Sequence, residues 1–406
     1  MPLIALAELL GQPEASRFLR QVVGSGRYGN AYLFHGPSGI GKGTAALAFA
    51  RAALCDRVPG AAAAEAPAPD ASLFGDAAPA PAAMGDDACC ACAACRKTGQ
   101  LLHPDLKLVF PVSGEEKVVE GETIPAAFEG LRSDPFYAFQ FDKAASIRLF
   151  QTRALQRELG YKPFEASRRV VVIRDCDRMR EDQYSSLLKG IEEPGAATIW
   201  VLTTSRLARV PATIRSRCQQ VRFLPLQEHV LQGVLEGAAG VSHSNAVLLA
   251  ALSGGSLARA LVLRDGDPTA ERDAAMRLLA PAKQGDAPGL WKAVQLTAGY
   301  GKTGREKLRR LLEHQQLWLR DLLRIRYGDD GMTLVHRDRE GDLRKEASQI
   351  DAQEIRRRLL VTEEAIRSID GNISVELTLF STLSRVAGRQ LGENAWPSYS
   401  AGRVDV

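Results

Sequence analysis

The chain has 406 residues, a length that allows two or three domains, each with its own hydrophobic core. Hydrophobic residues (45%) and charged residues (25%) are at levels usual for globular proteins, and the formal net charge of +4 permits contact with nucleic acid without indicating it. No apolar run is long enough to cross a membrane and the first residues do not resemble a secretion signal, so we expect a cytoplasmic protein without a membrane partner. Its seven cysteines are then expected to be thiols or metal ligands.

The first half of the chain is predicted to be an α/β domain, because short apolar strands alternate with helical segments. Strands are predicted at 31–34, 106–110, 170–173, 198–202 and 221–224, and helices at 44–54, 146–160 and 182–193. The strand at 170–173 is apolar at every position, which is typical of a parallel sheet covered on both faces. After Pro225 the pattern is helical, with long amphipathic helices expected at 290–326 and 355–388.

Two segments interrupt this pattern. Residues 58–88 include 13 Ala and five Pro but no Lys or Arg, a composition that predicts a disordered insert. Residues 113–143 are partly acidic and are expected to be irregular. Long insertions in surface loops cost little stability, so neither segment argues against the α/β domain.

Residues 35–44 form a phosphate-binding loop between a predicted strand and a predicted helix. In such loops glycines let backbone N–H groups surround a phosphate, a lysine neutralises it, and the next Ser or Thr hydroxyl binds Mg²⁺. Gly43 stands at that Ser/Thr position, and Thr44 comes one residue late, about 100° further around the helix. A purely structural turn and a loop that binds ATP or ADP without hydrolysis both stay open. The candidate nucleotide-binding residues are Gly36, Gly39, Gly41, Lys42, Gly43 and Thr44.

A second departure concerns the carboxylate that ends a buried strand in Mg²⁺-dependent NTPases. Arg174 stands where that Asp is expected, directly after the strand at 170–173, and Asp175 stands in for the usual Glu. Together with Gly43, this removes both protein contacts to the metal, so we expect no ATP hydrolysis by the chain alone. A weaker interpretation makes Arg174 an internal counter-ion for bound phosphates.

Four cysteines form a candidate metal site, with Cys89, Cys92 and Cys95 in a double Cys-x-x-Cys pattern and Cys55 before the insert. Two-residue spacings let successive sulfurs converge on one tetrahedral Zn²⁺, and four sulfurs leave no open position for catalysis. Cys90 competes with Cys89 as a ligand, and free thiols on a loop are the alternative. The remaining cysteines are expected to pack as small apolar residues.

Arg217 follows a loop and precedes the last predicted strand. An Arg at such a place can reach the γ-phosphate bound to a neighbouring subunit and stabilise the charge that develops during phosphoryl transfer. From spacing alone, a solvated side chain is the commoner outcome for an exposed Arg.

These features together resemble the delta prime family of bacterial DNA polymerase III clamp-loader subunits, over most of the chain outside the two insertions. The combination of the zinc knuckle, Ser216-Arg217-Cys218 and the segment 187–194 is specific to clamp loaders, whereas the phosphate loop alone is not. The other segments that resemble the family are 11–12, 30–34, 103–105, 177–179, 203–205, 254–257, 370–373, Leu377 and Leu379.

The resemblance implies an AAA+ fold with structural Zn²⁺ at the four cysteines. It implies a non-hydrolysing subunit that supplies Arg217 as an arginine finger in trans to a neighbouring gamma/tau motor subunit. The implied partners are those motor subunits and the delta subunit in a hetero-pentamer, which reaches the sliding clamp and primed DNA. The implied domains are an α/β P-loop AAA+ domain at 1–225 with a zinc module at 55–95, a helical lid at 226–270, an all-α collar at 271–395 and a tail at 396–406.

Alternatives remain at this point. An ATP-hydrolysing gamma/tau-like motor subunit shares the knuckle and the Ser-Arg-Cys segment, and another P-loop ATPase is also considered, although Gly43 and Arg174 argue against both. Arg259 lies one residue beyond the usual place of the family's lid arginine, where Ala258 stands, so nucleotide binding stays open. An independent DNA-binding protein ranks last, because the sequence lacks a basic stripe with interleaved aromatic residues.

Overall fold

The structure is a computed structural model that separates into two compact units, Met1–Val234 with Gly254–Arg259, and Leu235–Ser253 with Ala260–Val406. Most of the predicted insert at 58–88, most of the segment 187–194 and the tail at 396–406 lie outside the described residues. The structure describes residues 4–58, 85–114, 116–134, 137, 145–180, 183–184, 190–191, 197–266, 268–284, 286–298, 301–328, 334–370 and 373–388.

The first unit is built on a five-stranded sheet with the order β2-β3-β4-β1-β5, in which every neighbouring pair is parallel. Its strands are β1 (Ala31–His35), β2 (Leu106–Val109), β3 (Arg169–Ile173), β4 (Thr198–Thr204) and β5 (Gln219–Arg222). The predicted parallel α/β sheet is confirmed. The last strand spans Gln219–Arg222 in place of the predicted 221–224.

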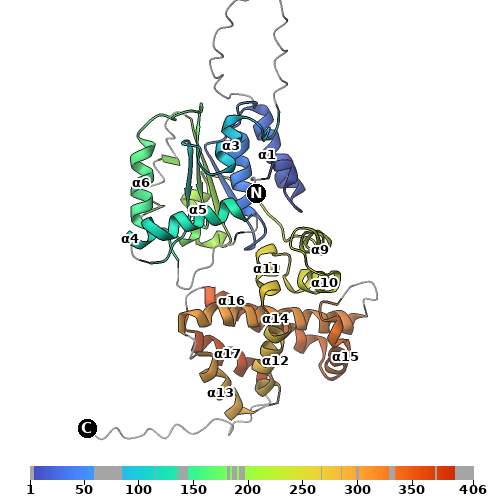
Figure 1. The fold of residues 1–406 in the computed structure, drawn as a ribbon. Coiled ribbons are helices and arrows are strands. Elements are labelled where there is room, and N and C mark those ends of the chain that lie inside the picture. Colours follow the sequence, from blue (N-terminus) through green and yellow to red (C-terminus); the bar gives the residue numbers. More distant parts are fainter. Residues whose placement is uncertain are drawn as a thin grey trace, which may run out of the picture. The chain divides into compact units, whose positions relative to one another are not determined.

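Side chains that alternate along the strands fill two separate cores, one on each face of the sheet. Tyr32 and Phe34 pack on one face with α1 (Pro13–Ser25) and α2 (Lys42–Ala53). Leu33 lies in the core of the opposite face, which α6 (Leu149–Leu159) covers. Figure 1 shows α1 and α6 on opposite sides of the strands. The strands β1, β3 and β4 are therefore buried on both faces, as their apolar residues predict.

The segment 113–143 differs from the prediction, because its described residues are largely helical rather than irregular. Val119 and Ala127 are buried and pack with Phe110 and Val112 at the end of β2, and this small core explains why the segment folds. The other helices of the first unit are α3 (Ala93–Gly99), α4 (Glu116–Val118), α5 (Ile124–Ser133), α8 (Ala212–Arg215), the π-helical turn Val119–Thr123 and the 3₁₀ turns Leu6–Glu8, Cys176–Arg178 and Leu207–Arg209.

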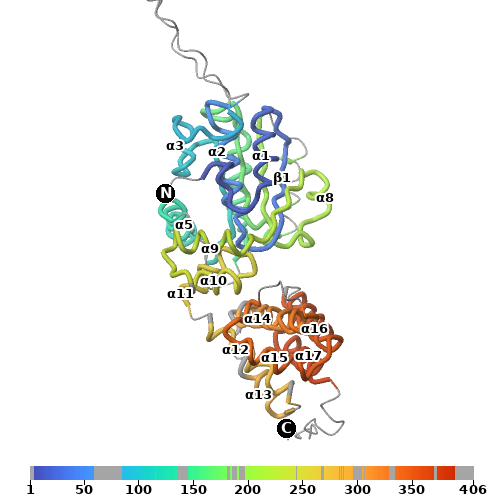
Figure 2. Tube along the Cα trace, turned by 90° about the vertical axis from the view of Figure 1, so that its right-hand side faces the viewer, coloured from blue at the N-terminus to red at the C-terminus, as the bar shows by residue number. Residues whose placement is uncertain are grey.

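Every described element after β5 is a helix, so the helical character predicted beyond Pro225 is confirmed in this part of the chain. Helices α12 to α17 pack around shared apolar cores, with α14 against both α15 and α16 (Figure 2). The helices are α9 (Glu228–Gly237), α10 (His243–Leu252), α11 (Leu257–Asp265), α12 (Pro268–Gln284), α13 (Ala287–Ala298), α14 (Gly301–Tyr327), α15 (Glu340–Gln349), α16 (Ala352–Asp370) and α17 (Val375–Ala387), with a 3₁₀ turn at Arg337–Arg339.

Each of the two long helices expected here is in fact a pair. The stretch 290–326 is divided between α13 and α14, and the stretch 355–388 between α16 and α17. The sequence contains glycine at both divisions, Gly299 and Gly371, and glycine inside a helix is destabilising by about 1 kcal/mol relative to alanine. The periodicity of the apolar residues continues across these breaks, which is why it suggested single helices. The division into lid and collar stays a prediction.

Candidate functional site

The phosphate loop joins β1 to α2 and takes a backbone path that requires glycine. Gly36, Gly39 and Gly41 have φ values of +149°, +74° and +95°, in the region that L side chains rarely adopt. A Cβ atom on Gly36 would lie 2.3 Å from the carbonyl oxygen of Phe223, and one on Gly39 would lie 2.2 Å from Oγ of Ser256. The loop therefore keeps the backbone conformation for which the motif needs its glycines.

Lys42 begins α2 and is only 6% exposed. Its Nζ donates to the carbonyl oxygen of Gly36 at 2.8 Å and to that of Pro37, both within the loop. No carboxylate of the described residues forms an ion pair with this ammonium. Burial, partly opposed by Asp175 and Asp177, lowers the pKa of Lys42 to about 8. The loop thus holds a buried cation whose hydrogen-bond partners are neutral.

Gly43 and Arg174 turn out to be spatial neighbours. A Cβ atom on Gly43 would lie 2.7 Å from both Cζ and Nε of Arg174 and 2.8 Å from its Nη2, closer than real Cβ contacts allow. Arg174 follows β3 directly, and its backbone N–H donates to the carbonyl oxygen of Val109 at 2.8 Å. The guanidinium therefore uses the room left by the missing side chain at position 43. Thr44, the third residue of α2, is half-buried.

The acidic residues after β3 take part in structural contacts. The backbone N–H of Asp175, which has a φ of +47°, donates to Oγ1 of Thr203 at 3.0 Å. The buried carboxylate of Asp177 accepts from the Thr204 hydroxyl at 2.7 Å and pairs with Nε of Arg206 at 3.2 Å. These bonds tie the carboxyl ends of β3 and β4 together beside the loop. Asp177 is therefore already neutralised by groups other than Lys42.

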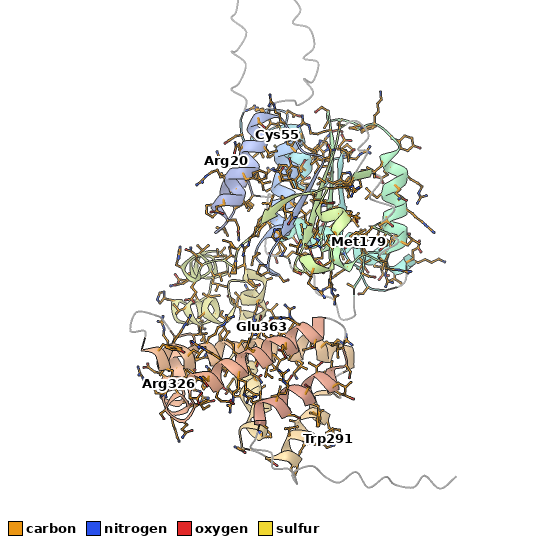
Figure 3. All side chains as sticks on the ribbon, turned by 180° about the vertical axis from the view of Figure 1, so that it is seen from behind. Arg20, Cys55, Met179, Trp291, Arg326 and Glu363 are labelled. Carbon is orange, nitrogen blue, oxygen red and sulfur yellow. The ribbon has the colours of Figure 1, made fainter. Side chains whose placement is uncertain are left out.

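The four predicted ligand cysteines converge at one place, where each pair of their sulfur atoms is within 4.8 Å. Sγ of Cys55 lies 3.9 Å from that of Cys92, and Sγ of Cys89 lies 4.0 Å from that of Cys95. Tetrahedral Zn²⁺ with Zn–S bonds of about 2.3 Å would place its sulfurs about 3.8 Å apart. Cys55, labelled in Figure 3, lies just past the end of α2 and is buried. The sulfurs therefore fit one tetrahedral metal ion.

Backbone N–H groups point at these sulfurs, an arrangement that favours thiolates. Cys55 accepts from the N–H groups of Arg57 and Cys89, both at 3.4 Å, and Cys92 accepts from that of Cys95 at 3.3 Å. A hydrogen bond from Cys95 lowers the pKa of Cys55 to about 5, whereas burial raises the pKa of Cys92 to about 11. Without a cation the thiols compete for one negative charge, and a bound metal ion would hold all of them ionised.

In the structure Cys89 belongs to the sulfur cluster and Cys90 does not. Cys90 has a φ of +57°, which turns its side chain out of the cluster, and its Sγ contacts the carbonyl oxygen of Ala88 at 3.5 Å. Cys90 is exposed, and it is not among the four clustered sulfurs. Cys176 and Cys218 are buried in the core beside α6, which confirms their predicted role as small apolar residues.

The two ends of the insert meet beside the cysteines. The N–H of Gly85 donates to the carbonyl oxygen of Arg57 at 3.0 Å. Asp87 then accepts from the N–H groups of Leu6 and Ala7 at 3.0 and 2.8 Å, and Asp86 pairs with Arg20 at 2.8 Å. The chain therefore leaves and re-enters the fold at one place.

Arg217 comes two residues after the short helix α8 and is exposed. Its Nη1 donates to the carbonyl oxygen of Thr213 at 3.0 Å, while the next residue, Cys218, is buried and anchors the segment in the core. An exposed arginine on an anchored segment is accessible to another molecule. The sequence-predicted site residues thus fall into three groups: the loop, the cysteine cluster and Arg217.

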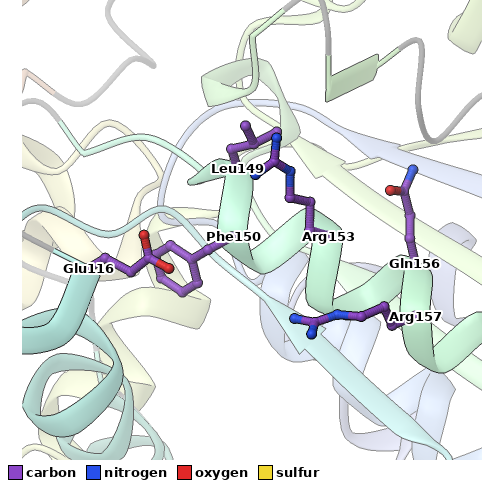
Figure 4. Close-up of a pocket in the computed structure, with 6 residues that line it drawn as sticks. All are labelled: Glu116, Leu149, Phe150, Arg153, Gln156 and Arg157. Carbon is purple, nitrogen blue, oxygen red and sulfur yellow. The ribbon is translucent and has the colours of Figure 1, made fainter.

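A surface pocket of about 700 Å³ lies on α6, apart from all these residues (Figure 4). The predicted nucleotide, metal and arginine positions contribute nothing to its wall. It is lined by Glu116, Leu149, Phe150, Arg153, Gln156 and Arg157.

Sequence reasoning missed the structural role of Asp105, although it noted the segment 103–105. This buried carboxylate accepts from the backbone N–H groups of Phe164, Glu165 and Ala166 at 2.6 to 2.8 Å. It thereby fixes the loop that leads into β3, and Lys97 of α3 pairs with Glu165 at 2.7 Å. The position of Asp105 directly before β2 is the only sequence signal of this role. Its partners lie about 60 residues later and could not be inferred from the sequence.

Comparison with known proteins shows what the chain is similar to. The family model described as "DNA polymerase III, delta subunit" matches residues 70–227. DNA polymerase III subunit delta' of Bacillus subtilis (strain 168) is 28% identical over 368 residues, which cover 90% of this chain and 93% of that protein.

Two further relatives match a shorter part of the chain. Subunit delta' of Pseudomonas aeruginosa is 27% identical over 237 residues, or 58% of this chain and 56% of that protein. Subunit tau of Bacillus subtilis is 24% identical over 226 residues, or 56% of this chain and 30% of that subunit. Of these three matches, the one to the Bacillus subtilis delta' subunit extends over almost all of both proteins. The chain is thus similar to clamp-loader subunits of DNA polymerase III, and the nearly full-length match fits a delta prime subunit.

Proposed function

We propose that this chain is a non-hydrolysing AAA+ subunit of a DNA polymerase III clamp loader, which helps to place a sliding clamp on primed DNA. The observation that carries the proposal is the contact between Gly43 and Arg174, which replaces both protein ligands of the catalytic Mg²⁺ with a guanidinium. A P-loop NTPase needs that ion to bridge and neutralise the terminal phosphates. The chain on its own is therefore expected not to hydrolyse ATP. Its expected location is the cytoplasm.

Arg217 gives the subunit its part in catalysis. Its exposure and the buried anchor at Cys218 support a role as an arginine finger that reaches the ATP of an adjacent gamma/tau-like motor subunit. The partners in this proposal are motor subunits and a delta subunit in a hetero-pentamer, which brings the chain to the clamp and to primed DNA. The domains are then the P-loop domain at 1–225, the lid at 226–270 and the collar at 271–395.

The cysteine cluster is proposed to bind structural Zn²⁺ through Cys55, Cys89, Cys92 and Cys95. The sulfur separations of 3.9 and 4.0 Å and the N–H groups directed at the sulfurs support this assignment. With four protein ligands the metal has no open position, so it contributes to folding rather than to chemistry.

A gamma/tau-like motor subunit is the second candidate, because the chain also matches a tau subunit over 226 residues. Steady-state ATP hydrolysis separates the two. The purified chain is expected to show no turnover. The mixture with its motor subunits, delta subunit, clamp and primed DNA is expected to hydrolyse ATP, and Arg217→Ala is expected to reduce that rate at least tenfold, given the 10³–10⁵-fold effects typical of arginine fingers.

Arg215→Ala is a matched control for this experiment, since Arg215 ends α8 two residues earlier. Its ATPase rate in the mixture should stay close to that of the wild type. Turnover by the isolated chain, or a mixture indifferent to Arg217→Ala, would contradict the proposal.

A further inference from the structure

We propose that the Arg174 guanidinium takes the place of the divalent metal ion, so that the phosphate loop binds the di- or triphosphate chain of a nucleotide without Mg²⁺. The inference deepens the non-hydrolysing role proposed above, and it rests on that proposal only for the identification of the loop as a nucleotide site. Loss of the metal ligands then changes the chemistry of the site and does not abolish binding.

Steric complementarity is the first argument. Atoms of the Arg174 guanidinium lie 2.7 to 2.8 Å from the position that a Cβ atom on Gly43 would take. In a metal-dependent loop the hydroxyl that holds Mg²⁺ extends from this same Cβ. The guanidinium thus occupies the room of the hydroxyl and its neighbourhood, and a side chain at position 43 could not coexist with Arg174 in its present place. Gly43 and Arg174, the two departures from the motif, therefore depend on each other sterically.

Charge is the second argument. Lys42 is buried with two backbone carbonyls as partners, and Arg174 adds a second cation beside the first turn of α2. Of the nearby acids, Asp177 is already bonded to Thr204 and Arg206, and Asp175 offsets part of the charge of both Lys42 and Arg174. Burial, with Arg222 and Lys42, lowers the pKa of His35, so the mouth of the loop also disfavours further positive charge. An anion would relieve this accumulation.

The ligand class follows from the donors. A guanidinium presents paired N–H groups that match two phosphate oxygens, and glycine-rich loops direct backbone N–H groups at the same anion. Lys42 would exchange its carbonyl partners for phosphate oxygens when the ligand enters. Two cations and a helix N-terminus suit a chain of two or three phosphates. Arg174 cannot bridge the β- and γ-phosphate oxygens as a metal ion does, so binding is not expected to lead to hydrolysis.

Binding of ADP to the purified full chain tests the inference by isothermal titration calorimetry, once with Mg²⁺ and once with EDTA. Wild type is expected to bind ADP with the same affinity, within about twofold, in both buffers. Inorganic pyrophosphate is expected to displace ADP in EDTA, because the phosphate chain is the recognised part. Mg²⁺-dependent binding, no binding in either buffer, or no displacement by pyrophosphate would overturn the inference.

Three variants locate the effect. Arg174→Ala should weaken ADP binding in EDTA at least tenfold, and Gly43→Ala should do the same by displacing the guanidinium while leaving Arg174 in the chain. The paired variant Gly43→Thr/Arg174→Asp restores a hydroxyl and a carboxylate, so it should bind ADP at least tenfold more tightly with Mg²⁺ than with EDTA. Paired-variant binding that is indifferent to Mg²⁺ would contradict the coupling.

Arg153→Ala is the control, because Arg153 is an exposed arginine of α6 outside the loop and should leave ADP affinity unchanged. Thermal unfolding checks that each variant is folded. If Arg174→Ala does not fold, Gly43→Ala tests the same contact. The titration needs no partner subunit and no turnover. A failure here would therefore leave the trans role of Arg217 standing, and a failure of Arg217→Ala to lower turnover would leave this measurement unaffected.

Discussion

The cysteine cluster and the phosphate loop both carry sequence motifs of ion-binding sites, but they differ in which parts of the motif they retain. The cluster retains four sulfurs within 4.8 Å of one another, each placed to reach a single cation. The loop retains its glycine conformation and Lys42, but a guanidinium lies beside Gly43 where a metal ligand would extend. One site is complete in its ligands, whereas the other is complete only in its backbone.

This difference separates two uses of a cation. A closed four-sulfur site stabilises a fold, and nothing about that use depends on turnover. A metal in a phosphate loop serves the transfer of a phosphoryl group, and a subunit that no longer performs the transfer can lose the metal ligands without unfolding. The following substitutions break or sharpen the comparison, and they are arranged from the largest expected effect to the smallest.

Cys95→Ser should have the largest effect, because it removes one of two buried ligands of the cluster. Zinc content, measured on the purified protein, should fall from about one ion per chain to near zero. The free energy of unfolding of the first unit should drop by about 3 kcal/mol or more, since the binding energy of a structural metal is folding energy. Cys218→Ser, a buried thiol outside the cluster, should leave the zinc content unchanged.

Lys42→Met should change the pH dependence of stability. The folded-state pKa of Lys42 is lowered from 10.5 to about 8 by burial, so between these pH values the unfolded chain binds the proton and the folded chain does not. Stability therefore rises with pH in this window. Between pH 8 and pH 10.5, the free energy of unfolding of wild type should rise by up to about 3 kcal/mol relative to that of Lys42→Met.

Urea denaturation of both proteins at several pH values checks this prediction. The two carbonyl hydrogen bonds that Lys42→Met also removes contribute equally at each pH, so only the slope matters. Parallel stability curves for wild type and variant would show that Lys42 is not a buried cation in solution.

Cys90→Ser should have the smallest effect. Cys90 is exposed, and its φ of +57° directs the thiol away from the other sulfurs. We expect about one zinc per chain and a change in unfolding free energy within about 0.5 kcal/mol, as for most surface substitutions. Cys89→Ser is the matched neighbour and should lose the metal, so equal zinc contents for the two variants would reverse the assignment of the ligand.

The sheet could be predicted well because most of its strands are apolar and lie next to clear turn signals. The strand at 170–173 and the loop at 35–44 came from local patterns alone, and the structure has both. The helices in 113–143 were missed, since Val119 and Ala127 become a buried face only against Phe110 and Val112. The ends of α13 at Ala298 and of α16 at Asp370 were missed because the apolar periodicity continues beyond them.

The candidate site, like the fold, could be predicted only in part. Cys-x-x-Cys spacing was enough to bring the sulfurs together, but the choice between Cys89 and Cys90 depends on a backbone angle that spacing does not encode. Gly43 and Arg174 were each recognised as departures from a motif. Their contact depends on β3 and α2 being adjacent in the folded sheet, so the sequence could not reveal that one makes room for the other.

The hydrogen bond between the N–H of Gly85 and the carbonyl oxygen of Arg57 joins the two ends of the insert within the described fold. The entropy of closing a loop grows only with the logarithm of its length. This junction is therefore a permissive insertion point at which evolution can lengthen or shorten the chain with little penalty. A fluorescent reporter could be placed there for tracking the protein in living cells, with the metal cluster and the phosphate loop left intact.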